Sequence, residues 1–151
     1  FLHGGFLHIL SNMWFLWVFG DNIEGHFGFI LFFILYFLSG IVGNVVQYLL
    51  MSSSTIPMLG ASGAVAGILG AYFVLFPHST IKTLVPISFL LTTVNIPAAF
   101  MLGYWFVLQI LSGAATLPFM NDQGGIAFWA HIGGFVTGLI MANIFKRKGV
   151  F

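Results

Sequence analysis

Long apolar runs separated by short polar segments dominate the hydrophobic pattern of this 151-residue chain. Asp, Glu, Lys and Arg are absent from residues 25–81, from residues 83–121 and from residues 123–145. One helical crossing of a bilayer takes about 20 residues. The longer uncharged stretches have room for more than one crossing, so the pattern predicts a polytopic membrane protein.

Five crossings result when the apolar runs are divided at their polar, glycine and proline positions. We expect them over residues 6–19, 29–51, 61–76, 97–117 and 126–145. The first of them would end in the polar cluster Gly20 to His26. No strand pattern stands out, so the predicted fold class is all-α, a transmembrane helical bundle. Apart from a closed barrel, such a bundle is the architecture that satisfies backbone polar groups in lipid.

Residues 81–96 are apolar but are interrupted by Lys82, Pro86 and Asn95. The segment is short for a membrane span. We interpret it as a short helix that lies in the membrane interface or dips into it, and a sixth crossing is the alternative.

The composition excludes an ordinary soluble domain, because only 5% of the residues are charged and 60% are hydrophobic. Soluble domains carry about 25% charged residues. With no cysteine, the chain has neither a disulfide framework nor a thiolate metal site. We expect residues 1–151 to form a single membrane domain cut from a longer protein, since the chain begins at Phe1 without a methionine.

The basic residues predict the orientation, because cytoplasmic loops concentrate Lys and Arg. The tail Lys146, Arg147 and Lys148 places the C-terminus in the cytoplasm, and five crossings then place Phe1 outside and Lys82 inside. All four basic residues fall on one side of the membrane. They are too few to indicate a nucleic-acid partner.

Polar residues gather at the outer ends of three predicted helices. His3, His8 and Asn12 belong to the first crossing, Ser62 begins the third, and His131 lies near the start of the fifth. His8 and Asn12 are four apart and share one helix face. The third crossing would rise only ~24 Å against a hydrocarbon core of about 30 Å. We therefore expect Ser62 to lie in a recessed, hydrated pocket.

The three acidic residues are poorly placed to complete a catalytic triad. Asp21 and Glu24 lie at the inner end of the first crossing, a helix length from Ser62, and Asp122 lies in an outer loop. The sequence therefore indicates a serine and histidine pair without an acid.

That pair has a chemical interpretation in which Ser62 is a nucleophile and His131 the base that takes its proton. His8 and Asn12 would donate hydrogen bonds to a developing oxyanion, helped by the Ser62 N–H at a helix N-terminus.

Structural explanations compete with this chemistry. A serine before a helix is usually an N-cap, and the pairs Gly63/Gly67 and Gly134/Gly138 have the spacing of close helix packing. Polar groups within crossings nevertheless point to function. From the residues alone, a hydrolase and a conduction or transport site both stay open.

Three motifs together resemble the rhomboid family of intramembrane serine proteases, and the likeness covers essentially the whole chain. They are His-Gly-Gly-Phe-Leu-His-Ile-Leu-Ser-Asn over residues 3–12, Gly-Ala-Ser-Gly over 60–63, and Ala-His-Ile-Gly-Gly-Phe-Val-Thr-Gly over 130–138. Each motif is weak alone. In this order and on one side of the membrane, the three are highly specific.

The resemblance implies that Ser62 is the nucleophile and His131 the general base. It implies an oxyanion hole of His8, Asn12 and the Ser62 N–H. Supporting positions would be Gly60, which keeps its loop close to the serine, together with Gly63 and His3.

For the protein as a whole, the resemblance implies cleavage of transmembrane or juxtamembrane segments of other membrane proteins, with no cofactor and no metal. The helix over residues 97–117 resembles the family's lateral gate, with Phe100, Met101 and Trp105 lining substrate access. The expected location is a bacterial cytoplasmic membrane, with the active site toward the outer side. The sequence indicates no oligomeric state.

The chain departs from the family pattern in two places. It supplies what resemble the second to sixth of six core helices, without the first helix and the loop after it. Ala66 stands where some relatives have a tyrosine that stacks on the histidine. A catalytically silent rhomboid-like binder of membrane clients is the alternative function, although such relatives typically lack the serine or the histidine.

Overall fold

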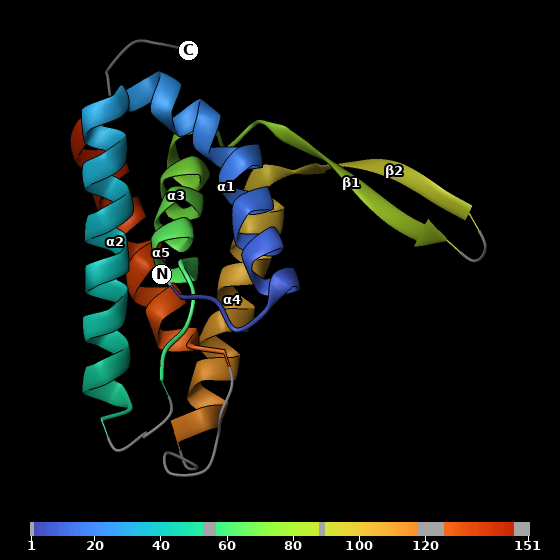
Figure 1. The fold of residues 1–151 in the computed structure, drawn as a ribbon. Coiled ribbons are helices and arrows are strands. Elements are labelled where there is room, and N and C mark those ends of the chain that lie inside the picture. The colour runs from blue at the N-terminus through green and yellow to red at the C-terminus, as the bar shows by residue number, and fades with distance from the viewer. Residues whose placement is uncertain (1, 53–56, 88–89, 118–125, 147–151) are drawn as a thin grey trace.

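The computed structural model describes residues 2–52, 57–87, 90–117 and 126–146, and this part of the chain forms a helical bundle with one projecting hairpin (Figure 1). The elements in chain order are α1 (Phe6–Phe27), α2 (Phe29–Leu50), α3 (Ser62–Leu75), β1 (Thr80–Ile87), β2 (Leu90–Pro97), α4 (Ala98–Thr116) and α5 (Phe128–Phe145). The predicted class, a transmembrane helical bundle, is confirmed.

Helix α3 is the centre of the bundle, with the other helices around it (Figure 1). All of its residues from Ala64 to Tyr72 are buried. The helix has no polar face, so it is stable only where neighbours cover it on every side. Its side chains join Ile23 of α1, Leu35 of α2 and Phe135 of α5 in one hydrophobic core.

Glycines bring the backbones of α3 and α5 into direct contact. A Cβ added at Gly134 would clash with the carbonyl oxygen of Gly63, and one at Gly138 would clash with that of Gly67. A Cβ at Gly70 would likewise clash with the carbonyl of Phe135. The four-residue glycine spacing therefore produces the close packing that it predicts.

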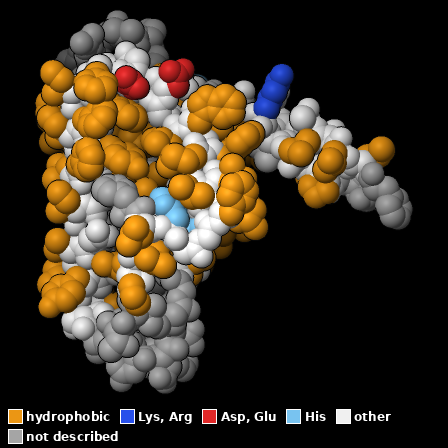
Figure 2. Space-filling model, in the orientation of Figure 1, with side chains coloured by type: hydrophobic (Ala, Val, Ile, Leu, Met, Phe, Trp, Pro, Cys, Tyr) orange, Lys and Arg blue, Asp and Glu red, His pale blue; other side chains and the backbone are white. Residues whose placement is uncertain are grey.

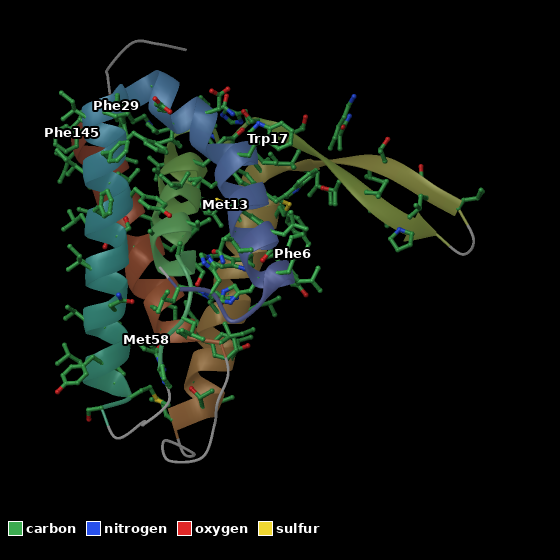
Figure 3. All side chains as sticks on the ribbon, in the orientation of Figure 1. Phe6, Met13, Trp17, Phe29, Met58 and Phe145 are labelled. Carbon is green, nitrogen blue, oxygen red and sulfur yellow. The ribbon has the colours of Figure 1, made fainter. Side chains whose placement is uncertain are left out.

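Three of the described helices are long and apolar enough to cross a membrane, namely α2, α4 and α5. Helix α3 is apolar but has only 14 residues. Hydrophobic side chains cover much of the outer surface (Figure 2); Phe6, Met13 and Trp17, for example, lie exposed along α1 (Figure 3). An apolar exterior around a packed bundle is what an integral membrane protein requires.

Helix α1 is longer than predicted, because it continues through the expected polar end to Phe27. Ile23 and Phe27 are buried four residues apart, while Asp21 and Glu24 are exposed. Gly20 lies inside the helix, where a Cβ would be 3.3 Å from Leu16 and 3.6 Å from Phe32. This glycine therefore lies within the helix and does not end it.

The prediction of an interfacial helix over residues 81–96 is wrong. The segment forms an antiparallel hairpin whose register runs from Thr80 opposite Pro97 to Ile87 opposite Leu90. Pro86 would break a helix at its middle. The strands are also rich in Thr, Ile and Val, whose branched side chains favour extended backbone.

We expect Gly138→Ala to destabilise the fold by about 1–3 kcal/mol, because its methyl group would push α5 away from the Gly67 carbonyl. Gly25→Ala is the matched control, since no atom lies within 4 Å of a Cβ built at this helical glycine. Thermal unfolding in detergent, followed by circular dichroism, measures the difference. Equal midpoints for the two variants would contradict the backbone contact.

Candidate active site

Ser62 lies at the N-terminus of α3, in a recess within the bundle. Helix α3 begins well above the lower ends of α2 and α4 in Figure 1, and it is much shorter than α2. The recess is a cavity of about 600 Å³. The polar residues expected at the site line it, namely His8, Asn12, Ser62 and His131.

The Ser62 hydroxyl is hydrogen-bonded to a histidine from another helix. Its Oγ lies 2.7 Å from Nε2 of His131, which is in the first turn of α5. Ala61 occupies the N-cap position of α3, and no side chain caps the helix. The N-cap interpretation of Ser62 is therefore wrong, and its hydroxyl is directed to the imidazole instead.

Gln109 holds the other side of the same imidazole. Its Oε1 lies 2.7 Å from Nδ1 of His131, and both side chains are only 8% exposed. A carbonyl oxygen only accepts hydrogen bonds, so Nδ1 carries the proton and Nε2 is left to accept from the Ser62 hydroxyl. Gln109 thus favours the tautomer in which Nε2 of His131 faces the Ser62 hydroxyl as a hydrogen-bond acceptor.

Sequence reasoning missed Gln109, which comes from α4. A signal was available, because an amide side chain within a long apolar helix is costly in a membrane and points to function. What could not be read from the sequence was its partner, 22 residues further along the chain.

Packing around the start of α5 holds His131 in place. The Ala130 N–H donates to Oε1 of Gln47 on α2 at 3.2 Å. A Cβ at Gly43 of α2 would clash with the Ala130 carbonyl, so this backbone approach requires glycine. The Trp105 ring lies 5.8 Å from the imidazole, centroid to centroid, with the planes tilted by 35°. Trp105 thus supplies an aromatic neighbour to His131, and Ala66 does not.

A second group of residues surrounds His8, whose ring lies near Ser62. Gly60 has φ +113, a left-handed value that favours glycine, and a Cβ there would lie 2.7 Å from Nε2 of His8 and 3.7 Å from Oγ of Ser62. The Gly60 N–H donates to the Leu2 carbonyl at 2.5 Å. Gly60 therefore makes room for the His8 ring beside the serine.

His3 contacts the ring of His8, and Asn12 contacts its backbone. The His3 ring contacts His8 edge-on at a centroid distance of 5.2 Å. Asn12 is buried, and its Nδ2 donates to the His8 backbone carbonyl at 2.9 Å. An amide has two N–H groups, so the second one of Asn12 is left for the cavity. Gly63 lies against α5, because a Cβ built there would be 3.3 Å from the Ala130 carbonyl oxygen.

Some residues that were predicted to line substrate access, and the described acidic residues that were excluded from a triad, lie outside the cavity. Of the three residues predicted to line substrate access, Trp105 lines the cavity, whereas Phe100 is 68% exposed and Met101 packs against the core. Acidic side chains lie at the upper end of the bundle in Figure 2, distant from the histidine at mid-height. Asp122 lies outside the described residues. Among the residues that are described, no group of His, Asp or Glu is arranged to hold a metal.

These features define a membrane-embedded helical protein in which a half-buried serine is hydrogen-bonded to a buried histidine and glutamine in a recess. A family model described as the Rhomboid domain matches residues 1–148. The chain belongs to the rhomboid family.

Over the aligned region, about a third of the residues are identical between the chain and its curated relatives. It is 31% identical over 146 residues to RHOMBOID-like protein 6, mitochondrial, of Arabidopsis thaliana, covering 95% of this chain and 40% of that protein. It is 34% identical over 146 residues to Rhomboid protein 1, mitochondrial, of Saccharomyces cerevisiae, covering 93% and 38%. Against the rhomboid relative YdcA of Bacillus subtilis, it is 33% identical over 149 residues, covering 97% and 64%.

The chain spans 40% or less of the length of the first plant relatives that it matches. No solved structure matches the chain.

We expect the imidazole of His131 to carry its proton on Nδ1 when it is neutral, because Gln109 presents a carbonyl oxygen to that atom. Nitrogen-15 NMR of histidine-labelled protein distinguishes the two ring tautomers. Gln109→Leu removes the acceptor and should give a mixture of tautomers, whereas Gln47→Leu, which loses only a backbone contact, should keep the single form. A proton on Nε2 in the parent protein would contradict this arrangement.

Proposed function

We propose that the protein is an intramembrane serine endopeptidase that cuts transmembrane or juxtamembrane segments of other membrane proteins. The observation that carries the proposal is the chain of two 2.7 Å contacts from Ser62 through His131 to Gln109. A hydroxyl is a weak nucleophile until an adjacent base takes its proton, and the base works best when a third group orients it.

In the acylation step, Oγ of Ser62 attacks the carbonyl carbon of the scissile peptide while Nε2 of His131 takes the hydroxyl proton. The C–O bond forms, and the carbonyl oxygen becomes an oxyanion. His131 then passes its proton to the peptide nitrogen as the C–N bond breaks. Gln109 keeps Nδ1 protonated throughout and stabilises the imidazolium as a neutral acceptor, in the position where soluble serine proteases use a carboxylate.

The oxyanion would be stabilised by groups that surround Oγ. The N–H groups in the first turn of a helix have no partner within the helix, and Ser62 begins α3. The positive end of the helix dipole lies at the same place. Asn12 and His8 line the cavity from the α1 side and add side-chain donors.

Deacylation repeats the sequence with water as the nucleophile. His131 takes a proton from water, the hydroxide attacks the acyl carbon, and the proton returns to Oγ of Ser62 as the ester bond breaks. The recess gives water access for this step, because polar side chains line it at a depth where lipid would otherwise exclude water.

The geometry also favours a membrane substrate with extended backbone at the cut. A peptide bond within a helix has its carbonyl and N–H engaged in the helix, so it cannot also present its carbonyl to Oγ and the oxyanion donors. Segments with locally weak helices would therefore be cut best.

For orientation, we propose that the C-terminus is cytoplasmic and that the recess opens toward the other side. Lys146 follows the end of α5, whereas His131 lies in its first turn. Basic residues favour the cytoplasmic side.

Ser62→Ala and His131→Ala should each lower the cleavage rate of a transmembrane substrate in vesicles by about four or more orders of magnitude. Both variants should also lose labelling by a fluorophosphonate, which reports an activated serine without any substrate. Ser79→Ala and His78→Ala are matched controls at the opposite end of α3, and they should retain both activities.

The outcomes separate the proposal from its alternatives. A folded parent protein that captures membrane clients without cutting them, and does not label, would be a silent binder. Labelling that persists in Ser62→Ala would place the reactive serine elsewhere.

Asn12→Ala should lower kcat by about 10²–10³-fold with little change in KM, as expected when one oxyanion donor is lost. Asn22→Ala, an exposed asparagine on the same helix, is the control and should leave kcat unchanged. A loss that appears mainly in KM would assign Asn12 to substrate binding instead.

A further inference from the structure

The β1–β2 hairpin stands apart from the bundle and has no role in the proposed reaction. It leaves the bundle between the end of α3 and the start of α4 and runs sideways from the helices, well beyond them (Figure 1). The Ala98 N–H donates to the Ser79 carbonyl at 2.8 Å and closes the root of the hairpin. The two strands thus form a projecting arm that is tied to the bundle at its root.

We propose that this hairpin is a membrane-interface arm, lying on the lipid surface with one face against the acyl chains and its basic root among the headgroups. This placement of the arm does not require protease activity. The residues of its two faces, its unpaired strand edges and its position along the bundle all indicate the membrane interface.

The two faces of the hairpin differ in polarity near the root. Directly paired residues in an antiparallel sheet share a face, and the register therefore gives each face its members. The apolar face, as we name it, consists of the pairs Ile81–Ile96, Thr83–Val94 and Val85–Thr92. The opposite face consists of Lys82–Asn95, Leu84–Thr93 and Pro86–Leu91.

Toward the turn, the arm is apolar on both faces and is not covered by protein. Leu84 is 60% exposed, Leu90 76% and Leu91 70%. An isolated two-stranded hairpin is marginal in water. Large exposed leucines on such a hairpin indicate that an apolar surface outside the described chain covers them.

The unpaired edges decide where that surface is. Each edge of a two-stranded sheet presents N–H and C=O groups that have no strand partner. Such groups are not tolerated in the hydrocarbon core, and the leucines disfavour open water. The boundary between the two satisfies both, because headgroups and their water reach the edges and the polar part of the opposite face near the root. Acyl chains cover the apolar face, which includes Leu90, and also reach Leu84 and Leu91 on the opposite face toward the turn.

The position of the arm's root agrees with this boundary. Its root joins the C-terminal end of α3 to the N-terminal end of α4, where Asp21, Glu24 and Lys146 also lie near helix ends. In Figure 2, a basic side chain stands at the upper side of the arm near its root, and hydrophobic side chains lie further out along it. Charged groups at one level of the bundle mark the membrane surface.

The absence of cysteine allows a clean test by single-cysteine spin labelling of the full chain in phosphatidylcholine and phosphatidylglycerol vesicles. Val94→Cys reports the apolar face, and its neighbours Thr93→Cys and Asn95→Cys report the opposite face. Collision rates with oxygen, which concentrates in lipid, and with a water-soluble nickel complex measure the depth. Ile41→Cys on the exposed side of α2 and Asp21→Cys provide the hydrocarbon and aqueous references.

We expect the ratio of oxygen to nickel collisions at Val94 to be several-fold higher than at Thr93 and Asn95, and to approach that of Ile41. Equal, water-like ratios at all three positions would overturn the proposal by placing the arm in solution. Low collision rates with both reagents at Val94, together with disulfide-linked dimers, would overturn it in favour of a second copy. If Val94→Cys does not fold, Val85→Cys reports the same face.

Discussion

Direct contact between the backbones of α3 and α5 is the constraint on which the site depends. Ser62 and His131 come from different helices, and the close approach of the two backbones fixes the position from which their side chains make a 2.7 Å contact. Gly63, Gly67, Gly134 and Gly138 provide that closeness, because any side chain at the last two would clash with a carbonyl. The glycines therefore help to set the distance between Ser62 and His131, although they carry no reactive group.

The depth of the site follows from a second simple constraint, the length of α3. Helix α3 begins deeper in the bundle than its neighbours, so a hollow lies in front of its N-terminal turn. The segment before the helix, including Met58, forms one wall of that hollow (Figure 3). The same first turn supplies the free N–H groups. One short helix thus provides the recess, the position of Ser62 within it and a helix end with free N–H groups.

Hydropathy and motif spacing predicted the bundle, the recessed Ser62 and the polar residues that share its cavity, because burial in lipid imposes strong patterns on a sequence. Two local predictions failed where patterns are ambiguous. The segment from Gly20 was interpreted as a helix end although α1 continues to Phe27, and a short apolar run cannot distinguish helix from strand without the branched residues and Pro86. The partner of Gln109 was unpredictable in a different way, since a side-chain contact between two helices leaves no characteristic spacing in the chain.

Gln109 places the third member of the polar chain on a helix that is far less embedded than α3. On α4, Ala98, Leu102, Gln109 and Gly113 are the residues that are buried. Moving α4 outward by more than the reach of one side chain would widen the cavity beside Trp105 and would also withdraw the acceptor from Nδ1 of His131. The width of the opening and the hydrogen bond between Nδ1 of His131 and Gln109 are therefore linked. Under the proposed mechanism, proton transfer would be best supported when α4 lies closest to α5.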